Sequence, residues 1–305
     1  MRAFLFPGQG AQFAGMGRDA FTTSGIIRDI FNRANDVLER DLTGVMFEGP
    51  EEELRQTRNA QPAIFLHSYA LYQLLGNPHP AMAAGHSLGE YTALTVANAL
   101  TFDDALRLVQ LRAHAMQDAG TTAAGTMAAI IGLEDEAIAA ICRAVGEEIG
   151  VVQPANFNSP GQVVVSGTPE AVAEVMTRAK SGGARMAKQL NVSGAFHSPL
   201  MEPARVTLAE ALERAPMRDA EFPVYANVTA APLTHAEDIR ALLLQQLTAP
   251  VLWTGTIQRM AADGATEFIE VGPGNVLQGL AKRIAAETAQ YGVADIAGVE
   301  AFNAR

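Results

Sequence analysis

Residues 81–100 read AMAAGHSLGEYTALTVANAL and hold one serine between two glycines at a change of pattern. Residues 81–84 predict a short strand from their position between a proline-rich break and the glycines, although alanine is a poor strand former. The apolar stretch after the glycines predicts a helix. Gly85, Ser87 and Gly89 therefore have the GxSxG form of a nucleophile elbow, a sharp strand-to-helix turn that presents a serine hydroxyl.

This short motif leaves two interpretations open. Given ordinary glycine and serine usage, GxSxG arises by chance in about one chain in ten to thirty. Ser87 is then either a residue of an ordinary turn or a nucleophile. For a nucleophile, the N-terminus of the following helix would direct backbone N–H groups at an anion formed beside the serine.

The first 120 residues alternate strand and helix patterns around this turn. Residues 2–6 (RAFLF) predict a strand, and residues 61–75 predict a helix with Pro62 in its first turn. A second helix is expected after Thr101, which is a good N-cap. Strands that alternate with helices indicate an α/β fold with a parallel sheet.

Residues 126–192 follow a different order, β-α-β-β-α-β, which is that of a ferredoxin-like unit. We therefore expect a small ferredoxin-like subdomain inserted into a larger α/β domain made of residues 1–125 and 193–305. The chain returns at SGAFHSPLM, where Ser198 is a candidate cap for the next helix. A last strand is expected at TEFIEV, followed by GPGN and a final helix.

Composition excludes several classes of function. The 305 residues are 49% hydrophobic and carry a net charge of −11, which disfavours a nucleic-acid partner. No apolar run has the roughly 18 residues of a membrane helix. A single cysteine, Cys142, excludes a disulfide framework and predicts a cytoplasmic protein. The metal-site and phosphate-loop motifs are missing, so we expect no metal.

A serine nucleophile needs a base, and the chain has six histidines. His197 is the preferred candidate because it lies where the chain re-enters the large domain, just before a helix N-terminus. The positive end of that helix would disfavour imidazolium and so favour a neutral base. His86 is the next candidate, although it adjoins Ser87. The others, in helices or loops where a surface or packing role is the default, are His67, His79, His114 and His235.

Arg112 lies in the middle of an apolar helix face formed by residues 105, 108, 109 and 116. A buried guanidinium needs an anion, because an unpaired buried charge is very costly. The partner is either a buried carboxylate such as Glu90 or the carboxylate of a substrate, for which the arginine fork is well shaped.

Eight stretches, taken together and in order, resemble one family. The sequence is similar to malonyl-CoA:acyl carrier protein transacylases and to the acyltransferase domains of polyketide synthases, from residue 3 to about residue 284. The stretches are FPGQGAQFAGMG, AQPAIF, AGHSLGEYTAL, LRAHAMQ, NFNSPGQVVVSG, GAFHSPLM, PVLWT and EVGPGNVLQGL. The last twenty residues carry no such motif.

The resemblance implies an α/β-hydrolase-like body with a ferredoxin-like insert, and a role for each matching residue. Ser87 matches the nucleophile and His197 its base, oriented by a backbone carbonyl near Leu252. The remaining matches are the oxyanion-hole amides of Gln9 and Leu88, the carboxylate-binding Arg112, and the polar positions Gln61 and Asn158 around the site.

The implied activity is the transfer of a malonyl group from malonyl-CoA to the phosphopantetheine thiol of an acyl carrier protein. No metal or redox cofactor is expected, because one thioester replaces another. Leu88 and Phe196 occupy positions where methylmalonyl-accepting relatives tend to carry a bulky polar residue and a serine, so malonyl is favoured. Arg185 and Lys188 are candidates for docking the acidic carrier. Alternative functions are a serine thioesterase or hydrolase on the same architecture, and a non-catalytic docking module.

Overall fold

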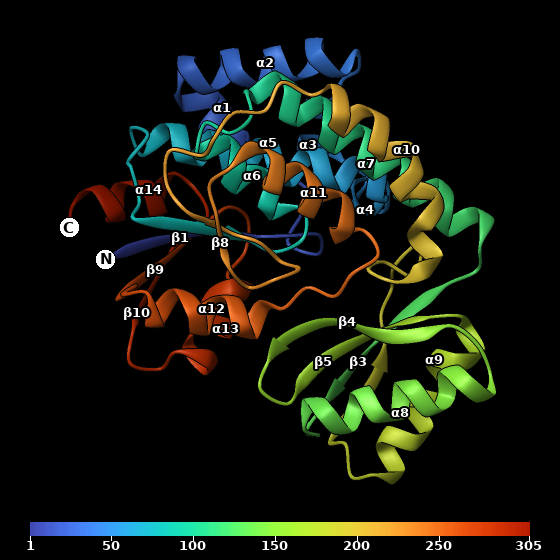
Figure 1. Ribbon diagram of the computed structural model, residues 1–305. Helices are drawn as coiled ribbons and strands as arrows, with labels where there is room; N and C mark the ends of the chain where they lie inside the picture. The colour runs from blue at the N-terminus through green and yellow to red at the C-terminus, as the bar shows by residue number, and fades with distance from the viewer.

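Two β-sheets with their covering helices form the computed structural model, which describes residues 1–305. The larger sheet and most of the helices form the upper body in Figure 1, and the smaller sheet lies below them. Both chain ends lie on the same side of the upper body, away from the smaller sheet (Figure 1). None of the helices combines the length and apolar character needed to cross a membrane.

The larger sheet has the strand order β10-β9-β1-β2-β7-β8, and every neighbouring pair is parallel except β7 with β8. In β1, one of the two central strands, Phe4 and Phe6 pack on one face of the sheet and Ala3 and Leu5 on the other. Because both faces are buried, this strand is a continuous apolar run without polar alternation. The strands are β1 (Arg2–Phe6), β2 (Met82–Gly85), β7 (Val224–Tyr225), β8 (Pro232–Leu233), β9 (Glu267–Val271) and β10 (Ala289–Val293).

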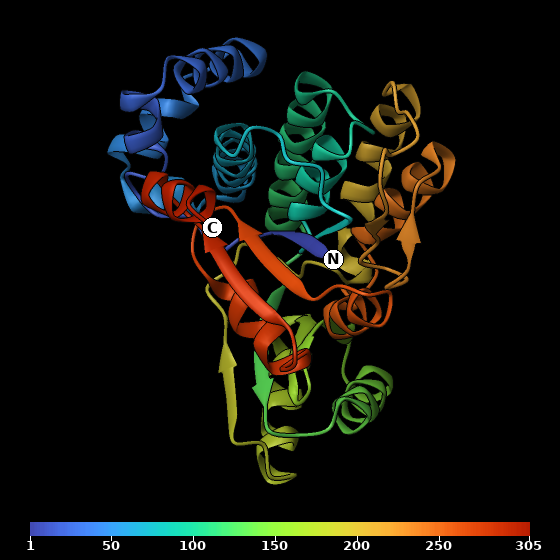
Figure 2. The ribbon, with the colours of Figure 1, turned by 90° about the vertical axis from the view of Figure 1, so that its left-hand side faces the viewer.

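Helices cover both faces of this sheet (Figures 1 and 2). Trp253 and Leu277 belong to the core on the face of Ala3, on helices α12 (Trp253–Ala262) and α13 (Val276–Ile284). The helices that contribute to the core on the face of Phe4 are α1 (Arg18–Thr23), α2 (Gly25–Leu38), α3 (Leu42–Glu48), α4 (Glu51–Arg55), α5 (Thr57–Leu74), α6 (Gly89–Val96), α7 (Phe102–Thr122), α10 (Glu202–Arg214), α11 (Ala236–Gln246) and α14 (Ile296–Asn303).

The predicted caps have the expected contacts. Thr101 accepts a hydrogen bond from the backbone N–H of Asp104 at 3.2 Å, at the start of α7. Ser198 accepts one from the backbone N–H of Leu200 at 3.3 Å. The helix expected there begins as a single 3₁₀ turn, Pro199–Met201, and continues as α10. Each hydroxyl satisfies one of the free donors that a helix start leaves.

The smaller sheet has the order β4-β5-β3-β6, with all neighbours antiparallel. Numbered within this unit, the order is 2-3-1-4, which is the arrangement of a ferredoxin-like β-α-β-β-α-β unit. Its elements are β3 (Thr126–Ile131), α8 (Asp135–Glu148), β4 (Val152–Ser159), β5 (Gln162–Gly167), α9 (Pro169–Ser181) and β6 (Met186–Gln189). Residues 126–192 as the boundaries of a subdomain stay a prediction.

Two expectations about the elements are wrong. Helix α5 begins at Thr57, so Pro62 lies inside it and not in its first turn. The sequence did not reveal this start because Gln56 makes no side-chain cap. Proline has no N–H for the carbonyl of Arg58, and Arg40 Nη2 donates to that oxygen at 2.9 Å instead.

The second error concerns the end of the chain. The strand at TEFIEV is β9, and it is followed by one more strand, β10, at the edge of the sheet. β10 is only partly buried and lacks an apolar run, so its sequence carried no strand pattern.

Stability is expected to fall with acidity because His67 in α5 is buried and neither of its ring nitrogens has a hydrogen-bond partner. Burial lowers its pKa to about 4. The unfolded chain binds a proton near pH 6.5 and the folded chain does not, so stability is full above that pH and declines below it. We expect this histidine to cost about 2 kcal/mol of unfolding free energy by about pH 5.

Urea unfolding of the wild type and of His67→Leu at about pH 7.5 and pH 5 measures this contribution. The loss between the two pH values should be smaller in the variant, which has no titratable side chain at position 67. An equal loss in both proteins would contradict the assignment to His67.

Candidate active site

Ser87 lies on the turn between β2 and α6, and its own backbone adopts φ 51°. A left-handed serine stores local strain, which is common at functional sites. The flanking glycines are required for a different reason, which is close approach. A Cβ on Gly85 would lie 1.8 Å from the carbonyl carbon of Gly89, and one on Gly89 would lie 2.0 Å from the oxygen of Phe6. The turn is thus packed tightly against β1.

Asn227, which follows β7, fixes this turn through hydrogen bonds of its side chain. Its Oδ1 accepts the backbone N–H of Ser87 at 2.6 Å, and its Nδ2 donates to the carbonyl of Gly85 at 2.7 Å. Its own backbone N–H donates to Glu90 Oε2 at 3.1 Å. Asn227 is fully buried. The sequence reasoning did not select it, because no local motif marks a residue 140 positions away from its partner.

His197 contacts the serine hydroxyl, with 2.8 Å between Nε2 and Ser87 Oγ. Its Nδ1 lies 2.8 Å from the backbone carbonyl of Gln246, so Nδ1 carries the proton and Nε2 is free to accept. Burial, and then the charge of Arg112, lower the pKa of His197 to about 3. The imidazole is therefore a neutral acceptor at physiological pH.

The prediction that a carbonyl near Leu252 orients this histidine is wrong. The carbonyl of Leu252 instead accepts the backbone N–H and the hydroxyl of Thr256, at 2.9 and 3.0 Å, in the first turn of α12. Its oxygen is committed to starting that helix. The carbonyl of Gln246 meets the imidazole because it lies at the end of α11, where carbonyls have no partner within the helix.

The side chain of Gln153, on β4, joins the same group of residues. Its Nε2 donates to the carbonyl of His197 at 2.8 Å and to that of Thr248 at 3.1 Å. Backbone hydrogen bonds of 2.8 and 2.9 Å also tie Ala155 and Phe157 of β4 to Val251. The smaller sheet is therefore bonded to the segments that position His197.

Arg112 is fully buried on α7 and donates to three neutral oxygens. The acceptors are Gln61 Oε1 at 2.7 Å from Nη1, and Ser87 Oγ and Gln246 Oε1, each 2.9 Å from Nη2. No carboxylate lies within 4.0 Å, so the alternative in which Arg112 pairs with Glu90 is wrong. Gln61, which the resemblance placed around the site, lies next to Arg112, and its role in binding substrate stays a prediction.

Two backbone N–H groups beside the serine have no hydrogen-bond partner in the protein, those of Gln9 and Leu88. These are the two amides predicted to form the oxyanion hole. Gly8 allows this approach, because a Cβ there would lie 2.4 Å from the carbonyl of His86. Both residues line the same cavity as Ser87, and their role as oxyanion donors stays a prediction.

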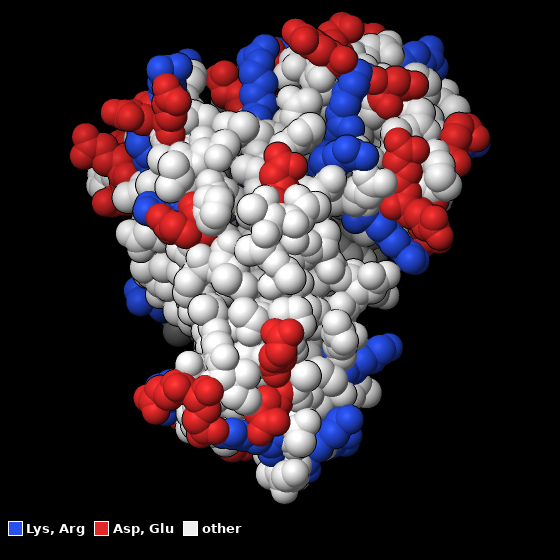
Figure 3. Space-filling model, turned by 90° about the vertical axis from the view of Figure 1, so that its right-hand side faces the viewer, with Lys and Arg blue, Asp and Glu red and all other residues white.

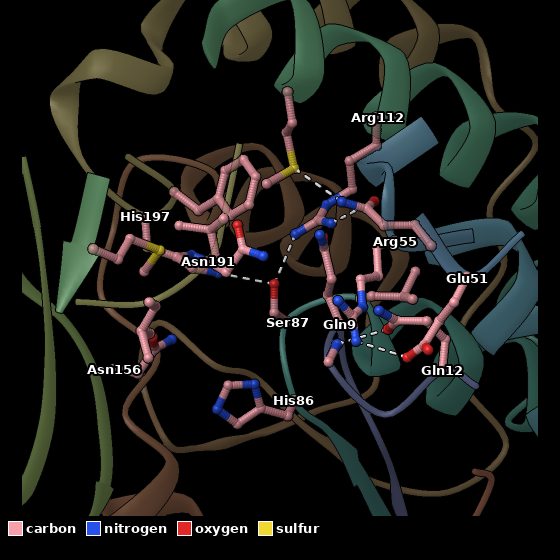
Figure 4. Close-up of a pocket in the computed structure, with 18 residues that line it drawn as sticks. Gln9, Gln12, Glu51, Arg55, His86, Ser87, Arg112, Asn156, Asn191 and His197 are labelled. Carbon is pink, nitrogen blue, oxygen red and sulfur yellow. Dashed lines mark hydrogen bonds and ion pairs between the residues drawn. The ribbon is translucent and has the colours of Figure 1, made fainter. Parts of the chain in front are cut away.

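A cavity of about 510 Å³ joins these groups (Figure 4). Its volume is typical of a small-molecule site. In Figure 4 the side chains of His197 and Arg112 converge on Ser87, and Gln12, Glu51 and Arg55 lie together on another side. Phe196 also lines the cavity, and its contact with the substrate stays a prediction.

Asn158 does not line this cavity, contrary to expectation. Its Oδ1 lies 2.9 Å from Nε2 of His86, and Asn156 lines the cavity in its place. β4 has register shifts between Pro154 and Asn156 and between Phe157 and Ser159. Such bulges re-aim side chains in a way that sequence alternation does not reveal.

The predicted docking residues Arg185 and Lys188 are exposed at the edge strand β6. Residues 190–192, which follow that strand in the chain, line the cavity. Figure 3 shows charged side chains of both signs over the upper helices and the lower unit, and fewer of them in the band between. The docking role of these two residues stays a prediction.

Comparison with known proteins identifies the class to which this fold and site belong. Residues 3–301 match the family model for the acyl transferase domain, so the chain belongs to the acyl transferase family. The resemblance and the α/β fold class expected from the sequence are thereby confirmed.

Individual relatives and solved structures show how similar the chain is to particular members of the family. The chain is 43% identical to a malonyl CoA-acyl carrier protein transacylase of Bacillus subtilis, over 98% of this chain and 95% of that protein. It is 46% identical to the one of Escherichia coli, over 92% of each. An acyl carrier protein S-malonyltransferase from Vibrio cholerae has a TM-score of 0.94 and 42% identity over 99% of each chain.

A further solved structure is the complex of a type II PKS acyl-carrier protein with its malonyl-transacylase. The chain matches it with a TM-score of 0.93 and 42% identity, covering 98% of this chain and 97% of that one. The present protein is an acyltransferase.

Proposed function

We propose that this protein transfers the malonyl group of malonyl-CoA to the phosphopantetheine thiol of an acyl carrier protein, through a malonyl-serine intermediate. One observation carries the proposal. A neutral base, His197, and a cation without an ion-pair partner, Arg112, both contact the hydroxyl of Ser87, at 2.8 and 2.9 Å. This pairing suits a nucleophile that takes an acyl group bearing a carboxylate.

In the first step, His197 Nε2 takes the proton of Ser87 as the serine oxygen attacks the thioester carbonyl. The backbone N–H groups of Gln9 and Leu88 stabilise the tetrahedral oxyanion, each worth roughly 2.7–4 kcal/mol. The carbon–sulfur bond breaks, and the thiol of CoA leaves with the proton from His197.

In the second step, the thiol of the carrier's phosphopantetheine arm gives its proton to His197 and attacks the malonyl-serine ester. Collapse of the intermediate returns the proton to Ser87 and releases malonyl-carrier. Arg112 holds the malonyl carboxylate throughout, as a planar fork that matches two carboxylate oxygens. One thioester replaces another, so the reaction balances without a metal ion or a redox cofactor, and we propose that none is used.

Leu88 and Phe196 support malonyl over methylmalonyl as the acyl group. Both line the cavity beside Ser87 and both are large and apolar.

A single buried cysteine, Cys142, is consistent with a reducing compartment, and we place the reaction in the cytoplasm.

Intact-protein mass spectrometry after mixing with malonyl-CoA tests the proposal. We expect one malonyl adduct, and peptide mapping should place it on Ser87. Ser87→Ala is the matched control and should carry no adduct. A stable adduct on another residue, or none in the wild type within a single turnover, would contradict the role of Ser87.

The same experiment separates the two alternative functions. On adding holo-carrier, the adduct should move from the serine to the carrier. A hydrolase would lose the adduct at the same rate without carrier. A docking module would bind the carrier without ever acquiring the adduct.

A further inference from the structure

An arginine and a glutamate, Arg112 and Glu90, share one buried network without forming an ion pair. Arg112 is 0% exposed and Glu90 is 1% exposed. A direct bond between them would be the ordinary way to compensate two buried charges. The structure instead keeps them more than 4.0 Å apart, although each lies in the electrostatic field of the other.

The side-chain amide of Gln246 lies between them. Its Oε1 accepts from Arg112 Nη2 at 2.9 Å, and its Nε2 donates to Glu90 Oε2 at 2.8 Å and to the carbonyl of Ser87 at 3.0 Å. A guanidinium only donates, so Arg112 requires the amide oxygen on its side and leaves the amide nitrogen facing Glu90. Gln246 is itself fully buried, which leaves it no alternative partner in water.

We propose that the side chain of Gln246 is a specificity-determining residue, which keeps Arg112 and Glu90 apart and so reserves the guanidinium charge for the acyl carboxylate. This inference rests on the proposed malonyl transfer. A neutral amide satisfies the hydrogen bonds of both groups without cancelling either charge. A direct ion pair would compete with the substrate carboxylate for the same donors.

The remaining groups around Glu90 are consistent with this role. The backbone N–H of Asn227 is its second donor, at 3.1 Å. Burial raises the pKa of Glu90 to about 7, although its hydrogen bonds to Gln246 and Asn227 and the charge of Arg112 act in the opposite direction. The guanidinium of Arg112 also lies 5.6 Å from the ring of Tyr91, a neutral neighbour. Glu90 is therefore the one carboxylate in this network that could capture Arg112.

The test compares kcat/KM for malonyl-CoA and acetyl-CoA in Gln246→Leu, which keeps the backbone carbonyl that orients His197. With the amide gone, Arg112 and Glu90 can pair directly, and we expect the malonyl-to-acetyl ratio to fall at least about tenfold. In the double variant Gln246→Leu/Glu90→Gln no competing carboxylate remains, so most of the ratio should return. Gln245→Leu, at the exposed neighbouring position, is the matched control.

Adding Glu90→Gln should restore the malonyl-to-acetyl ratio that Gln246→Leu lowers. If Gln246 only filled space in the core, the second substitution would not restore it. An unchanged ratio in Gln246→Leu, or a lowered ratio that the double variant does not restore, would overturn the inference. Gln246→Met, which is unbranched and closer in length, replaces leucine in both variants if Gln246→Leu does not fold. A wild type with no preference for malonyl-CoA would overturn the proposed function itself, and this inference with it.

Discussion

Replacing His197 with alanine should slow the acylation of Ser87 by malonyl-CoA about 10²- to 10⁴-fold. The serine hydroxyl then loses the acceptor that lies 2.8 Å from it, and no other side-chain base contacts it. Rapid-quench measurement of the malonyl-serine adduct gives the acylation rate directly, separately from transfer to the carrier.

His79→Ala is the control for this variant, because His79 is exposed in a loop and should be without effect. Acylation in a folded His197→Ala protein at the wild-type rate would make His86 the next base to test. The rate of Glu90→Gln, which lacks the buried carboxyl whose pKa is raised to about 7, should also lack a step near pH 6.5, because the pKa of His197 is lowered to about 3 and the imidazole stays neutral above that. A midpoint near pH 6.5 would show that the base is more exposed than its burial indicates.

Arg112→Ala should reduce malonyl transfer roughly 30-fold to several-thousand-fold. The pair that is lost consists of Arg112 and the malonyl carboxylate, and truncating one member of a buried charge pair costs about 2–5 kcal/mol. Each step of about 1.4 kcal/mol corresponds to a tenfold change in rate. Acetyl-CoA has no carboxylate to lose and should be affected much less, so the preference for malonyl should fall or reverse. Steady-state rates with both thioesters, measured on one folded variant, provide the comparison.

Arg112→Lys should recover little of the malonyl activity, because a point charge cannot reproduce the two-pronged contact. Thermal unfolding of both variants is the control for a purely structural role. Equal losses with both acyl groups, together with a lower melting temperature, would mean that Arg112 supports the fold and does not bind the substrate.

The elements that the sequence predicted well have strong local signals. The GxSxG turn and the strand Arg2–Phe6 are short local patterns, and the alternation within residues 126–192 is a succession of such patterns. The apolar face around Arg112 likewise predicted burial of this arginine, which the structure has.

The errors at the site have two physical causes, which are partners remote in sequence and bulges in a strand. The carbonyl that orients His197 belongs to a residue 49 positions away, and that of Leu252 is taken by its own helix. Asn227 acts across 140 positions. Asn156 replaces Asn158 in the cavity because of bulges in β4. None of these contacts leaves a periodic or compositional pattern in the chain.

The bonds between β4 and the larger body determine what kind of motion the site permits. Gln153 links the base's own loop to the segment after α11, and Ala155 and Phe157 pair with Val251. The β4 strand consequently braces His197, the proposed base, and we do not expect it to swing clear of the site as a lid would. The carrier's flexible arm would enter a preassembled site, with little induced fit. A chimera that exchanges the insert with that of a relative must preserve these β4 contacts. Otherwise the segments that position His197 lose the hydrogen bonds that hold them.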